Sequence, residues 1–90
     1  ASGNTALLGV CFKGNIKLAE YLISKGANIN AKNNNGTTPL LFSVMYNKIE
    51  SVNLLLRYNA DTSLIDNEGN TALRIAKNKG FKEIVSLLEN

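Results

Sequence analysis

The sequence predicts an all-α solenoid built from three stacked helix–turn–helix units. Two observations carry this prediction, a motif that recurs with a period of 33 residues and the helical spacing of apolar residues between its copies. The motif begins at Gly3, Gly36 and Gly69, and each Gly is followed by Thr two positions later and by Leu four positions later. A unit of this length cannot bury its own apolar face, so the copies are expected to stack and share one core.

The second copy shows most clearly why each unit should contain helices. Thr38 suits the residue before a helix, where its hydroxyl accepts a hydrogen bond from a free backbone N–H, and Pro39 suits the first helical position. Apolar residues at helical spacing follow, and the helix is predicted to end at Asn47, which aligns with Gly14 and Gly80. Gly and Asn adopt the left-handed conformation most easily, which is typical of a residue that ends a helix.

A second helix is predicted over residues 49–58 of the same copy. It should end at Asn59, which aligns with Gly26, so that Gly and Asn again alternate in one column. The polar segments 33–36 and 66–69 each end in Gly and are predicted to be turns. The second helices share an apolar column that is expected to be buried, and this column consists of Leu22, Leu55 and Leu88.

The two ends of the stack are predicted to differ. Two columns change from apolar to charged in the third copy, namely Cys11, Val44 and Lys77, and Ile23, Leu56 and Glu89. We therefore expect Lys77 and Glu89 to be exposed and the third copy to form a C-terminal cap. The first copy lacks a full leading turn and keeps apolar residues in both columns, so we expect it to have been cut from a longer array. The alternative is that its apolar face is tolerated in the fragment or is covered by a neighbour.

The composition excludes several kinds of chemistry. The 90 residues include one cysteine and no histidine, which excludes a disulfide framework, a His/Cys zinc cluster and a Ser-His or Cys-His nucleophile. Cys11 aligns with Val44 and is expected to be a small buried hydrophobe. Gly3, Gly36 and Gly69 are expected to be single turn residues one repeat apart and form no phosphate-binding loop. We expect no enzymatic activity, no metal site and no cofactor.

The charge pattern and the hydropathy bear on nucleic-acid binding, membrane insertion and cellular location. The net charge is +3, from 10 basic and 7 acidic residues that are spread along the chain without a run of one sign. Binding to nucleic acid, through Lys13, Lys32 and Lys79, is therefore the weaker hypothesis. No segment approaches the roughly 18 consecutive apolar residues of a membrane span, and no charged-then-apolar leader opens the sequence. We expect no membrane insertion and an intracellular, cytoplasmic location.

Several motifs resemble the ankyrin repeat. Thr38-Pro39-Leu40 opens a 33-residue unit that continues with Leu55-Leu56-x-x-Asn59-Ala60-Asp61, and Gly26-Ala27-Asn28-Ile29-Asn30-Ala31 is similar to the family's Gly-Ala-Asp-Val-Asn-Ala segment. Thr62-Ser63-Leu64 departs from Val-Asn-Ala and leaves the geometry of that connection open. The His that usually follows Thr-Pro-Leu in the family is replaced in all three copies, by Leu8, Leu41 and Arg74. The resemblance implies one ankyrin domain over residues 1–90, with repeats at about 1–33, 34–66 and 67–90.

The resemblance also implies a non-catalytic, monomeric module that binds another protein on its concave face and takes no small-molecule substrate. The residues that it places on this face, at the turn tips and at the exposed end of each first helix, are Phe12, Lys13, Asn34, Asn35, Thr37, Met45, Tyr46, Asn67, Glu68, Asn70, Asn78 and Lys79. Met and aromatic residues in the middle of this ladder, with lysines at its ends, suit a partner segment that carries an apolar residue flanked by acids. The alternative is a structural spacer or cap within a larger multidomain protein.

Overall fold

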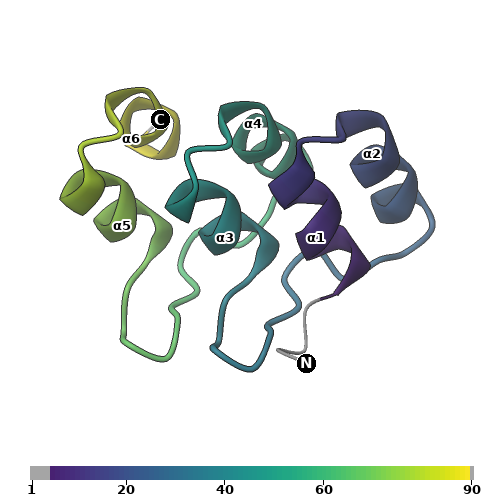
Figure 1. The fold of residues 1–90 in the computed structure, drawn as a ribbon, viewed down its shortest axis with the longest axis horizontal. Helices are drawn as coiled ribbons and strands as arrows, with labels where there is room; N and C mark the ends of the chain where they lie inside the picture. Colours follow the sequence, from purple (N-terminus) through teal and green to yellow (C-terminus); the bar gives the residue numbers. More distant parts are fainter. Residues whose placement is uncertain (1–4, 90) are drawn as a thin grey trace.

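The computed structural model describes residues 5–89, so Gly3 of the first motif lies outside the described residues. Within residues 5–89 the chain forms six α-helices and no strand, which confirms the all-α prediction. The helices are α1 (Ala6–Lys13), α2 (Ile16–Ser24), α3 (Pro39–Met45), α4 (Ile49–Arg57), α5 (Ala72–Lys79) and α6 (Lys82–Glu89). They form three antiparallel pairs that stand side by side, with long loops emerging from one edge of the stack (Figure 1).

The recurring threonines begin the first helix of each pair. Thr5, Thr38 and Thr71 have extended backbones, and each hydroxyl accepts a hydrogen bond of 3.1–3.2 Å from the backbone N–H three residues later. Such a side-chain cap typically stabilises a helix by about 1 kcal/mol. Pro39 occupies the first helical position, as predicted, where its missing N–H removes no helical hydrogen bond.

The alternating Gly and Asn residues end the helices as predicted. Gly14, Asn47 and Gly80 have φ angles of 76°, 57° and 73°, which lie in the left-handed region. Gly26 and Asn59, which follow the second helices, have φ angles of 92° and 63°. Each column therefore repeats one left-handed backbone conformation. Asn can replace Gly in these columns because a residue with a short polar side chain adopts this conformation at low cost.

The helix pairs are packed in two layers around one shared core. The first helices contact one another in the order α1, α3, α5, and the second helices in the order α2, α4, α6. Leu55, in the central pair, is fully buried, whereas Leu22 and Leu88 pack against the core but stay partly exposed. The predicted burial of this column thus holds fully only for the central repeat, because an end repeat has a neighbour on one side only.

The loop tips are held by one turn geometry in two copies. Asn33 Oδ1 accepts hydrogen bonds from the backbone N–H groups of Asn35 (2.9 Å) and Thr37 (3.0 Å). Asp66 Oδ1 accepts the equivalent bonds from Glu68 (2.9 Å) and Asn70 (3.0 Å). The glycines in these turns have positive φ, as predicted for Gly36 and Gly69. One carbonyl-type oxygen therefore suffices to build the turn, whether an amide or a carboxylate supplies it.

Neighbouring loops are also joined to each other. The backbone N–H of Asn67 donates to the carbonyl of Asn35 (3.1 Å), and the side-chain amide of Asn67 donates to the carbonyl of Asn34 (3.1 Å). A Cβ on Gly36 would lie 2.9 Å from the Asn67 backbone nitrogen, so this close approach requires glycine. These contacts fix the spacing of the loop tips and give the loop edge of the stack a defined surface.

The Thr62-Ser63-Leu64 segment keeps the geometry of its counterpart despite its different sequence. Asp61 Oδ1 accepts a hydrogen bond from the N–H of Ser63 (2.9 Å), as Asn28 Oδ1 does from the N–H of Asn30 (3.0 Å). The two connections are also linked, because the N–H of Asp61 donates to Asn30 Oδ1 (2.9 Å). The side chain at the first position of the turn therefore sets this geometry, and the residues that follow it are free to vary.

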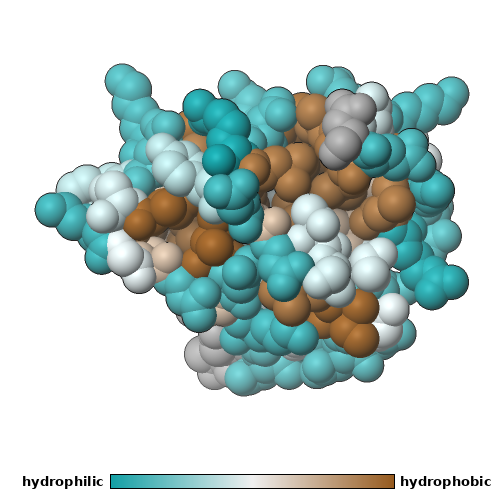
Figure 2. All heavy atoms as spheres, turned by 180° about the vertical axis from the view of Figure 1, so that it is seen from behind, coloured by the Kyte–Doolittle hydropathy of each residue, from teal (hydrophilic) through white to brown (hydrophobic). Residues whose placement is uncertain are grey.

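The two-layer core leaves some apolar surface outside. The face opposite to that of Figure 1 shows apolar patches between polar side chains (Figure 2). Large apolar or aromatic side chains are exposed at six described positions, namely Phe12, Leu18, Tyr21, Tyr46, Tyr58 and Ile65. Scattered exposure of this kind is ordinary, so a candidate site must show more than an exposed ring.

Candidate functional site

Three aromatic rings gather at the end of the first helices. Phe12 on α1, Phe42 on α3 and Tyr46 directly after α3 form three mutual ring contacts, with centroids 4.9–5.4 Å apart. Phe12 and Tyr46 meet edge to face, at an interplanar angle of 81°. Lys48 Nζ lies 5.2 Å from the centroid of the Phe12 ring, within the range of a cation–π contact. We call Phe12, Phe42 and Tyr46 the aromatic cluster.

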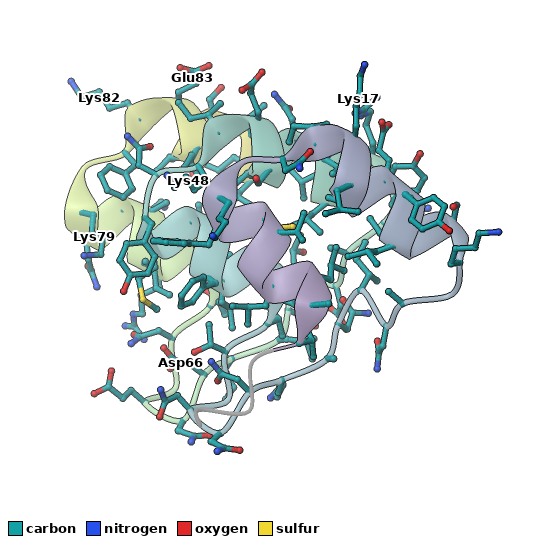
Figure 3. The ribbon with its side chains drawn as sticks, turned by 45° about the vertical axis from the view of Figure 1, so that its right-hand side comes forward. Lys17, Lys48, Asp66, Lys79, Lys82 and Glu83 are labelled. Carbon is teal, nitrogen blue, oxygen red and sulfur yellow. The ribbon has the colours of Figure 1, made fainter. Side chains whose placement is uncertain are left out.

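Two adjoining hollows lie beside this cluster, between the first helices and the loop tips. The larger, of about 370 Å³, is lined by Asn33, Asn35, Thr37, Phe42, Met45, Tyr46, Asp66, Asn67 and Glu68. The smaller, of about 250 Å³, is lined by Met45, Asp66, Glu68, Asn70, Ile75, Asn78 and Lys79. They share Met45, Asp66 and Glu68 and so lie side by side, and we call the two hollows together the groove. Figure 3 shows Asp66 on the loop side and Lys79 at the end of α5.

Most residues that the sequence places on the concave face lie along this groove. Those that line it are Asn35, Thr37, Met45, Tyr46, Asn67, Glu68, Asn70, Asn78 and Lys79. Phe12 belongs to the aromatic cluster, and Tyr46 joins the cluster to the groove. Lys13 and Asn34 are exposed but line neither hollow. The structure thus brings together residues from two loop tips and from the ends of α3 and α5.

Thr37, which the resemblance places on the binding face, lines the larger hollow but is largely buried. Thr37 is only 4% exposed. Its backbone N–H donates a hydrogen bond to Asn33 Oδ1, and its carbonyl accepts one from the N–H of Asn33 (3.0 Å), so both bonds close the turn. Thr37 therefore shapes the loop and presents little surface to a partner. Asn67 is exposed, but its amide is already engaged with the preceding loop.

Four groove residues were not predicted from the sequence, namely Asn33, Phe42, Asp66 and Ile75. Phe42 and Ile75 occupy one column and are spaced like core residues of a helix, so the pattern indicates burial for both. Asp66 was taken as a turn residue, which it is, although it also faces the groove. Only the packing of the loops beneath the helices shows that these side chains reach one surface.

The acids of the groove have no cationic partner within the described chain. Across residues 5–89 the ion pairs join Arg57 to Glu20 and Lys77 to Glu89, and neither involves Asp66 or Glu68. Lys79 lines the smaller hollow without pairing with either acid. The groove therefore holds two carboxylates beside aromatic and apolar side chains.

No group of three His, Cys, Asp or Glu side chains in residues 5–89 could hold a metal ion. Cys11 is fully buried, as predicted, and burial raises the pKa of its thiol to about 11, so it stays protonated at neutral pH. Lys32 donates to the carbonyl of Ile65 (3.0 Å) and so holds two repeats together. None of the described helices is both long and apolar enough to cross a membrane.

Comparisons with known proteins agree with the repeat geometry. Residues 6–90 match the family described as ankyrin repeats (3 copies). The chain is 44% identical over 91 residues to an ankyrin repeat protein of fowlpox virus, covering 96% of this chain and 27% of the viral protein. It is 35% identical over 92 residues to the ankyrin repeat protein YahD of Escherichia coli, covering 96% and 46% of the two chains. It is 34% identical over 85 residues to human BCL-6 corepressor-like protein 1, covering 94% and 5%.

The chain spans less than half the length of each of these relatives. Ankyrin repeats are generally non-enzymatic and mediate protein–protein interaction. The matched residues include all six helices and both loop tips described above. The chain therefore belongs to the ankyrin repeat family.

Proposed function

We propose that this chain binds a segment of another protein in the groove, without catalysis, and that the aromatic cluster anchors the segment. The observation that carries the proposal is the position of Tyr46, which is 50% exposed, packed against Phe12 and Phe42, and part of the groove wall. Aromatic residues and Met are enriched at the centres of protein interfaces, and Met45 lies next to Tyr46 on this wall.

The cluster is suited to binding because its rings are already ordered. The Tyr46 ring packs against both Phe12 and Phe42. Covering this ring with a partner should therefore cost little side-chain entropy. The hydrogen bonds from Asn67 to the preceding loop fix the opposite wall in the same way. A preorganised concave surface of this kind favours an extended or helical segment over a flat partner surface.

The test compares two tyrosines in equivalent structural positions. Tyr46 and Tyr58 directly follow α3 and α4, and they are 50% and 43% exposed. Twelve-residue peptides selected against the chain from a random display library serve as probes. Tyr46→Ala should weaken the binding of most selected peptides at least tenfold, roughly the effect of losing an aromatic anchor. Tyr58→Ala should change it little.

Circular dichroism must show that both variants are folded. Selected peptides that bind Tyr46→Ala as tightly as the parent, or that lose more affinity with Tyr58→Ala, would contradict the proposal. Peptides that lose affinity steeply with added salt but not with Tyr46→Ala would favour electrostatic binding of the kind that nucleic acids use.

We also propose that the apolar end of the stack packs against a further ankyrin repeat in the whole protein, which would give the chain a structural role within a longer array. Leu18 and Tyr21 are exposed on α2, whereas their counterparts Ile84 and Leu54 are buried against a preceding repeat. The greater length of the relatives supports this proposal. The repeat limits at 33 and 66, the monomeric state and the intracellular location stay predictions.

A further inference from the structure

The two loop tips share a backbone geometry but differ in charge. Asn33 and Asn35 in the first loop correspond to Asp66 and Glu68 in the second. Asn33 shows that a neutral amide supplies the two hydrogen bonds that the turn needs. The carboxylate of Asp66 is therefore not required by the turn, and Glu68 adds a second negative charge at an exposed position.

Both acids face the same aromatic wall. Asp66 and Glu68 line the larger hollow together with Phe42, Met45 and Tyr46, and they also line the smaller one. Asp66 is largely buried there, with Oδ1 already accepting two backbone bonds. A carboxylate whose surroundings are partly apolar attracts a cation more strongly than one in open water.

We propose that the groove takes an arginine side chain of the partner segment, an inference that rests on the proposed function and specifies its ligand. A guanidinium group in the larger hollow can lie against the ring of Tyr46 and donate hydrogen bonds to the carboxylates of Glu68 and Asp66. Its planar, weakly hydrated cation suits a site that combines an aromatic face with carboxylate acceptors.

Arginine fits this site better than the alternatives that the charge pattern allows. A lysine ammonium is compact and strongly hydrated, so it gains less from the aromatic wall and cannot pair with a carboxylate in a fork. An acidic residue of the partner would face Asp66 and Glu68 with like charge. The ammonium group of Lys79, at the far end of the groove, repels a cation bound there, so replacing this residue with a neutral one should strengthen arginine binding.

The test uses a small probe, so that it does not depend on knowing the partner. N-acetyl-arginine amide is titrated into the isotope-labelled chain, and amide chemical shifts are followed by NMR at constant ionic strength. N-acetyl-lysine amide and N-acetyl-norleucine amide are titrated in parallel. Arginine should shift the amide signals of Tyr46, Glu68 and Asn70 most strongly, with a dissociation constant at least about threefold lower than that for lysine.

Charge-neutral variants then test the acids. Glu68→Gln should weaken arginine binding about threefold, and Glu68→Gln combined with Asp66→Asn about tenfold, as expected for charge-assisted contacts that are partly exposed. Asp66→Asn should preserve the turn, since Asn33 forms it in the preceding repeat. Glu83→Gln is the matched control, because Glu83 lies on α6 at the opposite edge from Asp66 (Figure 3). Lys79→Gln should tighten binding.

Three results would overturn the arginine assignment, namely shifts no larger than those with norleucine, equal affinity for lysine, or equal affinity in the double variant and the parent. If any of these occurs while library peptides still depend on Tyr46, the groove binds proteins but does not select arginine. If arginine binds as expected while library peptides ignore Tyr46, the proposed function fails and the arginine site stands.

Discussion

The two ends of this stack differ in chemistry although they follow one 33-residue pattern. At the α1–α2 end, Leu18 is 41% exposed, while Ile84 in the same column is fully buried on α6, which packs against α4 of the repeat before it. At the α5–α6 end, Lys77 and Glu89 are exposed as predicted and form an ion pair of 3.3 Å. Figure 1 places these surfaces at opposite ends of the row of helices.

The comparison teaches that burial in a repeat fold is decided by the neighbour and not by the residue type alone. Val44 is fully buried because α5 and α6 follow it, and its counterpart Lys77 has no described repeat beyond it. The charged end is therefore compatible with water, whereas the apolar end gains stability from any surface that covers it. Three comparisons between substituted variants would break or sharpen this contrast.

The largest effect is expected from placing one charge at two equivalent positions. Ile84→Lys puts an unpaired ammonium in the core and should cost about 3–5 kcal/mol, which would unfold much of a chain of this size. Leu18→Lys should change the free energy of unfolding by less than about 0.5 kcal/mol, because the charge stays in water. Urea unfolding followed by circular dichroism measures both. A comparable loss at Leu18 would show that this end is covered.

A smaller effect is expected from truncating the leucine column. Leu55→Ala removes a fully buried side chain of the central repeat and should cost about 2–5 kcal/mol. Leu88→Ala, at a partly exposed position of the same column, should cost about half as much. Thermal and denaturant unfolding of the two variants would show whether the centre of the stack is more sensitive than its end. Equal losses would contradict the packing described here.

The smallest effect is expected from the ion pair at the charged end. Lys77 and Glu89 side chains are 55% and 51% exposed, so their coupling in a double-mutant cycle should be below about 1 kcal/mol. Added salt should reduce it further, since exposed charges are screened. A coupling energy well above this value would mean that the ion pair stabilises the end of the stack and is not an ordinary solvated surface pair.

Much of the fold could be predicted from local chemistry. Thr38 and Pro39 begin a helix, Asn47 and Asn59 end helices with positive φ, and Lys77 signals a solvent-facing end. These features are set within a few residues or by comparison of equivalent positions 33 apart. A periodic sequence is informative because each prediction about one repeat can be checked against the other copies.

The groove could be predicted only in part. Ladder positions such as Met45 and Lys79 follow from the period, because equivalent residues line up in a stack. Phe42 has the spacing of a core residue, and only the neighbouring Phe12 and Tyr46 rings show that it supports an exposed cluster. The resemblance places Thr37 on the binding face, and only the structure shows that this residue is 4% exposed.

By itself, then, the sequence determined the helices, their ends, the period and the charged end of the stack, since these depend on backbone propensity and on repeated positions. The tertiary structure decided which side chains meet across repeats. Asp66 forms a turn by its own local chemistry, but it faces Tyr46 only because the loops pack beneath the first helices. That arrangement depends on hydrogen bonds such as those from Asn67 to the loop before it, and contacts between segments 33 residues apart leave no local signature in either segment.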